Sequence, residues 1–362
     1  MTIRLSLTMI VRDEERTLGR VLAQAAGFCD EMVVVDTGST DDTPRIAKLA
    51  GAQVLDFAWR DDFAAARNHG LEACRGDWII WLDADDVITP AAQAAFAAAK
   101  DAVLGEDLDS ITAPYHYSVD PDTGRCTYTF PRERLARRVP GLRWTGAVHE
   151  VLTIPGDRTL HREDLVVEHH PDPVDRAAKT ERNLRVIEQE WRNGDRSSRT
   201  RYYYACELRD AGEDAAALEK YAEYLEDPGS DWEKYAALLS MSACCRRLGR
   251  TGAQADHLHA AIRLAPSRAE AFVALGKFHF DREEWADAIP FFAAAAALHQ
   301  PLTGFVSVPD YTWRAWDYLS VCLAHLGRHE ESVAAALHSA KLGNPDRSRL
   351  RSNVHWSLDQ WF

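Results

Sequence analysis

Hydrophobic and polar positions in the first hundred residues alternate between two periods. Apolar side chains occupy every second position over residues 5–11, as in a strand, and then follow helical spacing over residues 18–25. The alternation continues, with further strands predicted at 32–35, 52–57 and 77–83 and further helices predicted from 44, over 61–74 and from 90. Strands that alternate with helices predict a mainly parallel sheet covered on both faces.

The pattern changes between residues 108 and 170, where strands are joined by loops as in the substrate-facing half of an α/β enzyme. The predicted strands are 110–119, 126–130, 144–154 and 164–170. A long amphipathic helix is predicted over about 174–193, and a polar connector follows it at 192–200. The domain boundary is expected in this connector, which gives a first domain at 1–195, with halves at 1–105 and 106–195, and a second domain at 196–362.

The second predicted domain is helical and repetitive. Four units share a tight turn, a helix with small residues on one side, and a closing proline; these prolines, spaced 38, 35 and 44 residues apart, are Pro228, Pro266, Pro301 and Pro345. The middle spacing is close to the tetratricopeptide period of about 34 residues, and the others require insertions such as TGFVSVPDY (303–311). We therefore expect a tetratricopeptide-type, all-α domain with a C-terminal capping helix over 352–362.

Composition excludes several classes of protein. Lys and Arg number 42 against 56 Asp and Glu, a net charge of −14, so nucleic acid is not expected as a partner. No apolar run approaches the roughly 18 residues that a membrane-spanning helix needs. The seven cysteines lack a C-x-x-C pair, and the first residues alternate where a secretory signal would be continuously apolar. We expect a cytoplasmic protein.

Acidic residues follow three predicted strands in succession. Asp36 follows the second strand, Asp56 closes the third, and the stretch Asp83–Asp86 follows the fourth. The carboxyl ends of parallel strands share one edge of a sheet, where open α/β folds bind their ligands. Carboxylates repel an anionic ligand unless hydroxyls, ring N–H donors or a divalent metal mediate the contact. A nucleotide-sugar with Mg²⁺ or Mn²⁺ meets all three conditions.

Each charged position has an expected role in such a site. Asp36 or Asp56 could accept hydrogen bonds from ribose hydroxyls or a base N–H. Asp85, together with Asp83, could hold the metal that neutralises a diphosphate leaving group. The phosphates could also be contacted directly by two basic side chains, Arg67 and Arg12.

Four segments resemble the nucleotide-binding half of inverting family 2 glycosyltransferases with the GT-A fold: TMIVRDEERTL, VVVDTGSTDDT, DDFAAARNHGL and WIIWLDADD. Asp83-Ala84-Asp85 matches their D-x-D motif. The resemblance implies that residues 8–12 and Asp36 border the nucleoside, Arg67 the diphosphate and Asp85 the metal. The expected nucleotide-sugar site comprises Thr8, Ile10, Arg12, Glu14, Asp36, Asp56, Arg67, Asp83, Ala84 and Asp85.

Residues 134–152 and 166–184 are similar to a sub-branch of this family whose members carry a G-x-[VI]-H-E strand and a Lys-x-x-Arg-Asn helix. The sub-branch includes bacterial enzymes with C-terminal tetratricopeptide repeats, among them S-glycosyltransferases that modify bacteriocin peptides. The resemblance implies that Glu150 is the general base and that His169 completes the coordination of the metal. Asp86 and His149 are the alternative bases, because many members have an acidic pair where this chain has His149-Glu150. Expected contacts with the acceptor or the sugar are Trp144, His149 and Arg134.

The predicted function is a metal-dependent, inverting transfer from a nucleotide-sugar to an acceptor. Such a displacement needs a base opposite the leaving group. The resemblance favours a UDP-sugar, and the repeat domain favours a peptide or protein acceptor with a Cys, Ser or Thr nucleophile, or else a second subunit in a homodimer. Alternatives are a small-molecule or cell-envelope glycan acceptor, or a catalytically inactive scaffold. A sugar nucleotidyltransferase is disfavoured because no glycine follows the first strand before Gly19.

Overall fold

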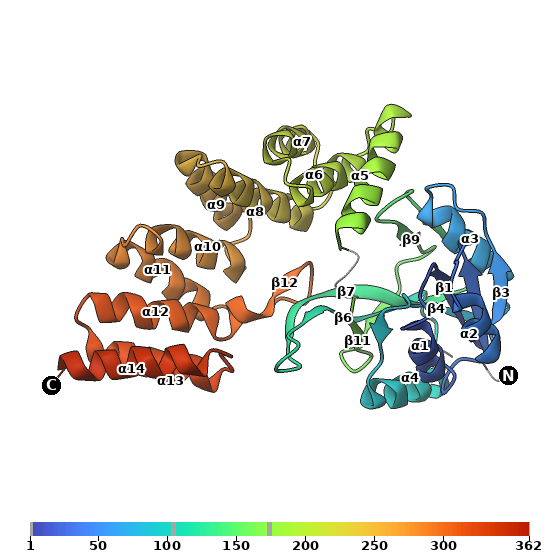
Figure 1. The fold of residues 1–362 in the computed structure, drawn as a ribbon, viewed down its shortest axis with the longest axis horizontal. Helices are drawn as coiled ribbons and strands as arrows, with labels where there is room; N and C mark the ends of the chain where they lie inside the picture. Colours follow the sequence, from blue (N-terminus) through green and yellow to red (C-terminus); the bar gives the residue numbers. More distant parts are fainter. Residues whose placement is uncertain (1–2, 103–105, 172–175, 362) are drawn as a thin grey trace. The chain divides into compact units, whose positions relative to one another are not determined.

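The computed structural model describes residues 3–102, 106–171 and 176–361, and the chain groups into two compact units. The first unit comprises Met1–Val119 and Thr129–Asp195, and the second comprises Asp120–Tyr128 and Arg196–Phe362. Residues 120–128, which lie within the first domain of the sequence prediction, therefore group with the helical part of the chain. Figure 1 shows the elements of both units, coloured along the sequence.

The first unit is built on a mixed sheet with the strand order β3-β2-β1-β4-β7-β6-β11-β5, in which β10 also pairs with β6. The strands are β1 (Leu5–Val11), β2 (Glu31–Asp36), β3 (Gln53–Asp56), β4 (Trp78–Trp81), β5 (Asp86–Val87), β6 (Ser110–Val119), β7 (Cys126–Arg137), β10 (Thr159–His161) and β11 (Val167–His169). Strands β1 to β4 are parallel, whereas β7 is antiparallel to β4 and β11 is antiparallel to β5. The predicted α/β class is confirmed.

Helices cover both faces of this sheet (Figure 1). Side chains of successive strand residues point to opposite faces, so each face forms its own hydrophobic core with the helices that cover it. Helices α1 (Leu18–Ala25), α2 (Thr43–Leu49) and α4 (Pro90–Ala102) pack on the face that carries Leu7 and Ile80. Helix α3 (Phe63–Ala73) packs on the opposite face, against Ile79 and Trp81. Burial on both sides explains why β2 and β4 contain continuous apolar runs.

Helix α3 approaches β1 closely because a glycine leaves room for a strand side chain. A Cβ atom added at Gly70 would lie 2.6 Å from Thr8 Oγ1 and 2.9 Å from a methyl group of Val35. At the start of the helix, the Asp62 carboxylate accepts a hydrogen bond from the backbone N–H of Ala65 at 2.8 Å, as an N-cap residue does. These two contacts fix the position of Arg67, which lies between them on the helix.

The prediction of one continuous strand over 144–154 is wrong. The segment forms a separate two-stranded antiparallel sheet of β8 (Arg143–Thr145) and β9 (Val151–Thr153). The connection between them contains two residues with left-handed backbone, Gly146 (φ 93°) and His149 (φ 51°), which an extended strand does not accommodate. Glu150 therefore lies in this connection and not on a strand.

The second unit consists mainly of successive helices that pack in pairs, as in tetratricopeptide repeats. The predicted all-α class of the second domain is confirmed. Its helices are α6 (Ser198–Asp210), α7 (Asp214–Glu226), α8 (Asp231–Arg247), α9 (Thr251–Leu264), α10 (Ala269–Phe280), α11 (Trp285–Ala296), α12 (Arg314–His325), α13 (His329–Lys341) and α14 (Arg347–Trp361). The insertion at 303–311 forms β12 (Val306–Ser307) and a short 3₁₀ helix at Val308–Tyr311. Within the described ranges, no helix has the length and apolar character needed to cross a membrane.

Candidate functional site

The three carboxylates after β4 lie in one tight turn. The backbone N–H of Asp86 donates to the carbonyl oxygen of Asp83 at 3.1 Å, and the N–H of Asp83 donates to Asp86 Oδ2 at 3.0 Å. The turn leads directly from β4 into β5, so Asp83, Asp85 and Asp86 are held on a short, fixed piece of backbone. Their side chains then meet three different sets of partners.

Asp86 is engaged inside the protein. Its side chain is fully buried, the Tyr115 hydroxyl donates to its Oδ1 at 2.9 Å, and Arg134 Nη1 lies 3.5 Å from its Oδ2. Burial raises the pKa of Asp86 to about 6, although the Arg134 charge opposes this shift. Both carboxylate oxygens of Asp86 are therefore occupied by protein groups.

Asp83 is paired with Arg67. The Nη2 of Arg67 donates to Asp83 Oδ1 at 2.7 Å, and the Nε of the same guanidinium donates to Glu150 Oε1 at 2.5 Å. Burial alone would raise the pKa of Asp83, but the Arg67 charge lowers it to about 2. One buried guanidinium thus links the D-x-D turn to the connection between β8 and β9.

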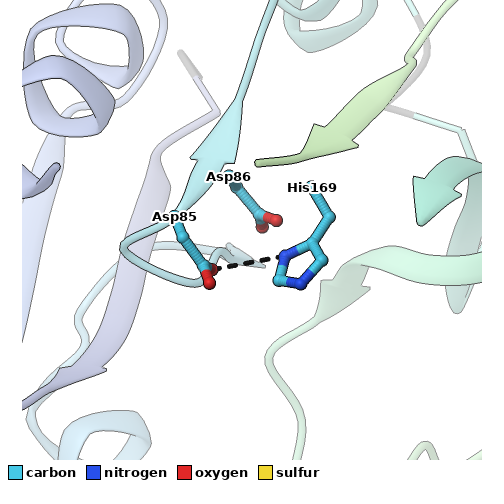
Figure 2. Close-up of side chains that lie close together, drawn as sticks. All are labelled: Asp85, Asp86 and His169. Atoms are coloured by element: carbon cyan, nitrogen blue, oxygen red, sulfur yellow. Dashed lines mark ion pairs between the residues drawn. The ribbon is translucent and has the colours of Figure 1, made fainter. Parts of the chain in front are cut away.

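Asp85 is the member of the turn that faces a histidine and a lysine. Its Oδ1 lies 3.4 Å from His169 Nδ1, and its Oδ2 lies 3.7 Å from Nζ of Lys179 on α5 (Arg176–Arg192). Figure 2 shows the Asp85 and His169 side chains pointing toward one another beside Asp86. The sheet sets this arrangement, because β11 pairs with β5 in the register His169 to Asp86.

This cluster has the donor set of a cation site. Ligand atoms of Asp85, Asp86 and His169 all lie within 4.8 Å of one another. Among the described residues, the buried His169 Nδ1 has no hydrogen-bond partner of standard geometry. Burial lowers the pKa of His169, but the Asp85 carboxylate outweighs this effect and the pKa lies above its ordinary value. A carboxylate facing an imidazole offers one oxygen and one nitrogen ligand, a mixed donor set that fits a divalent first-row metal ion such as Mn²⁺.

The positions predicted on and after β1 run from the middle of the strand, at Thr8, to the segment that follows its carboxyl end. Thr8 is buried, Ile10 is half-buried, and the exposed Arg12 has its Nε 3.8 Å from Asp13. Glu14 accepts a hydrogen bond from the Thr17 hydroxyl at 2.7 Å. Burial raises the pKa of Glu14, and the charge of Asp85 adds to the shift. Glu14 is therefore electrostatically coupled to the acidic turn.

Asp36 and Asp56 end neighbouring strands and are paired in register. The Asp36 carboxylate accepts hydrogen bonds from Ser39, from its N–H at 3.2 Å and its hydroxyl at 2.5 Å, so it closes the turn after β2. Asp56 is exposed. The structure thus brings both carboxylates to one edge, with Asp36 engaged in a turn and Asp56 open to solvent.

Arg134 and Trp144, expected to contact the acceptor or the sugar, are buried behind the site. Arg134 has no exposed surface, and its guanidinium lies 4.4 Å from the Trp81 ring. Trp144 is 3% exposed and packs edge-on against Trp81 at 5.1 Å, with the Arg67 guanidinium 4.8 Å from its ring. Side chains buried in this way support the turn from behind, and their contact with the acceptor or the sugar stays a prediction. His149 is half-buried beside Glu150.

Two residues at the site were not predicted. Lys179 lies within the Lys-x-x-Arg-Asn segment, so its motif was the available signal. Tyr117 on β6 is 48% exposed and stacks on the His169 ring at 5.2 Å with 13° between the planes. Its only sequence signal was an aromatic residue in a strand, which is too common to identify a site.

This chain is similar in part to a protein family, to two curated relatives and to a solved structure. Residues 6–125 match the family model described as glycosyl transferase family 2. A TPR repeat-containing protein of Synechococcus elongatus is 30% identical over 306 residues, which cover 73% of this chain and 76% of the relative. The SPbeta prophage-derived glycosyltransferase SunS of Bacillus subtilis is 24% identical over 234 residues, which cover 63% of this chain and 53% of SunS. A crystal structure of MamA covers 48% of this chain and 95% of its own, with 16% identity and a TM-score of 0.39.

The family match includes the segments that carry the D-x-D turn and the carboxyl ends of β1 to β4. The Synechococcus relative extends the similarity over most of both chains. Residues 6–125 are therefore a glycosyltransferase family 2 domain, and the chain is a glycosyltransferase with C-terminal tetratricopeptide repeats.

Proposed function

We propose that the enzyme is metal-dependent and moves a sugar from a UDP-sugar, with inversion, to a Cys, Ser or Thr side chain of a peptide or protein. The metal is supported by the different partners of the three carboxylates in the acidic turn. Arg67 pairs with Asp83, and Tyr115 and Arg134 engage Asp86. Asp85 instead faces His169, so the turn offers a carboxylate oxygen, the ligand type that Mn²⁺ and Mg²⁺ prefer, next to an imidazole nitrogen.

Asp85 and His169 would hold the cation, and Asp86 lies next to them in the cluster. A bound cation there supplies Lewis-acid neutralisation of the diphosphate leaving group. Lys179, 3.7 Å from Asp85, adds a positive charge on the same side of the turn. In this proposal the remaining nucleotide contacts come from residues 8–12, Glu14, Asp36 and Asp56.

Glu150 is the proposed general base. In the displacement, the acceptor oxygen or sulfur bonds to the anomeric carbon while the bond from that carbon to the diphosphate oxygen breaks, and the proton of the acceptor passes to Glu150. The Arg67 guanidinium, which donates to both Glu150 and Asp83, holds the base at a fixed place relative to the turn. His149 precedes it with a left-handed backbone and is the proposed contact on the acceptor side.

The acceptor class is supported by sequence similarity and by the second unit. SunS is a glycosyltransferase, and the sequence resembles the sub-branch that includes enzymes acting on bacteriocin peptides. Helical repeats form extended surfaces that suit a peptide better than a small metabolite. We place the reaction in the cytoplasm, since the cysteines are free thiols.

Release of UDP from a panel of UDP-sugars, with and without Mn²⁺ and after EDTA treatment, tests the proposal. We expect turnover only with metal, and we expect Asp85→Ala to abolish it. Asp157→Ala is the matched control, because this exposed aspartate lies outside the site. Turnover that persists in EDTA, or that survives Asp85→Ala, would overturn the metal-dependent mechanism.

A further inference from the structure

The second unit contains a cavity of about 210 Å³ that the transfer reaction does not use. All of its lining residues belong to that unit. It is formed by the first turns of α8 and α10 and by the insertion at 303–311, which the tetratricopeptide period marks as extra sequence. The insertion therefore builds a pocket that two regular repeats alone would not have.

The walls of the pocket are largely aromatic. Phe305 from the insertion packs edge-on against Trp232 of α8, with ring centroids 5.0 Å apart. Tyr128 stacks on the same phenylalanine at 5.8 Å, and Tyr235 of α8 forms a further wall. Such a surface favours an apolar or aromatic group, because ring contacts add to the free energy of burying apolar area.

The charges in the pocket are already paired with each other or with protein dipoles. Glu270 accepts hydrogen bonds from the Tyr235 and Tyr311 hydroxyls at 3.3 Å and 2.8 Å. Arg268 donates to the Thr303 carbonyl at 2.9 Å and also to the Phe305 carbonyl and to Glu270. A cationic ligand would find no unpaired carboxylate in Glu270, which argues against a lysine or arginine side chain as the occupant.

The volume limits the occupant to a single side chain. Sites for drug-sized ligands measure about 300–1,000 Å³, so a whole nucleotide-sugar does not fit. An apolar cavity of about 150 Å³ accepts benzene, so this pocket has room for one large apolar or aromatic side chain. We propose that the pocket anchors the peptide acceptor by such a side chain. This inference rests on the proposed peptide acceptor and names the chemistry by which it is bound.

Fluorescence anisotropy of labelled Gly/Ser peptides with one central Phe, Leu, Ala, Lys or Asp, titrated with the full chain, tests the anchor. We expect the Phe and Leu peptides to bind at least about ten-fold more tightly than the others. Ala236→Leu, which fills the pocket from α8, should remove this difference. Ala215→Leu on α7 makes the same change at an exposed position and should preserve it.

Trp232→Ala, which removes a wall and leaves the pocket open, provides a second test if the filled variant does not fold. We expect it to weaken binding of the Phe peptide by about ten-fold. Equal affinity for all peptides, preference for Lys, or unchanged binding in both variants would overturn the anchor. UDP release measured on the same samples separates the two proposals: intact metal-dependent turnover without peptide selectivity rejects only the pocket, whereas absent turnover rejects the proposed function.

Discussion

His169 Nδ1 lies 3.4 Å from Asp85 Oδ1, across the junction of β11 and β5. The antiparallel register brings a histidine from late in the first unit opposite a turn more than eighty residues earlier in the chain. The two side chains offer an oxygen and a nitrogen ligand at the edge of the sheet where family 2 enzymes are expected to bind their donor.

Removing His169 should weaken metal binding and leave the fold intact. We expect His169→Ala to reduce the affinity for Mn²⁺ by at least about ten-fold. Loss of a residue that only supports a metal ligand costs about 10–100-fold in affinity, and loss of a direct ligand should cost no less. Titration of Mn²⁺ followed by electron paramagnetic resonance measures this change. His170→Ala is the control, since the neighbouring histidine pairs with Glu168 instead. Equal Mn²⁺ affinity in the two variants would remove His169 from the site.

Arg67 should be a major determinant of stability. Arg67→Met leaves Glu150 and Asp83 without their shared partner, and breaking a buried ion pair costs about 3–5 kcal/mol. Arg45→Met removes an exposed pair with Asp42 and should leave the free energy of unfolding nearly unchanged, because water and salt screen such a pair. Urea unfolding monitored by tryptophan fluorescence gives both values. Similar free energies of unfolding for the two variants would show that the Arg67 pairs contribute little.

Asp86 should impose a specific pH dependence on stability. Its pKa is raised from 3.8 to about 6 by burial, so between these values the folded state binds more protons than the unfolded state. The free energy of unfolding should therefore fall as pH rises through this window, and Asp86→Asn should lack that component. Relative to wild type, the variant should gain about 2 kcal/mol between pH 4 and pH 7 in metal-free urea titrations. A difference that is constant with pH would contradict the assigned shift.

Alanine has a higher helix propensity than glycine, but at Gly276 the close packing of α10 against α11 should outweigh this advantage. A Cβ atom there would lie 2.6 Å from the ring of the fully buried Phe292. We expect Gly276→Ala to destabilise the protein by about 1–3 kcal/mol through overpacking. Gly252→Ala on α9, where a Cβ meets open space, should instead stabilise by about 0.5–1 kcal/mol. Thermal melts that shift in the same direction for both variants would contradict this packing.

The sequence predicts the regular parts of this fold well because their burial pattern is simple. Strand β4 (Trp78–Trp81) is apolar throughout, which is expected when both faces are covered. The prediction fails at 144–154, because the left-handed conformation of His149 is set by its surroundings and leaves no mark in the residue type. Hydrophobic periodicity predicts helices and strands, but it does not predict the conformation of irregular connections.

The site could be predicted only as far as its motifs reach. The D-x-D spacing identifies the turn, but it does not tell which carboxylate Arg67 will pair with, because that choice depends on how α3 packs on the sheet. The same limit applies to Arg134 and Trp144, whose residue types suit a surface contact and whose positions prove to be buried. Lys179 reaches Asp85 from a helix nearly a hundred residues later, and only the tertiary structure brings the two together.

Anomalous diffraction from crystals grown with MnCl₂ and UDP tests the central claim most directly. We expect a manganese peak about 2.0–2.3 Å from an Asp85 carboxylate oxygen and from a nitrogen of His169, in contact with the diphosphate. A bound UDP with no manganese between these two side chains, or a manganese ion held by other residues, would contradict the account.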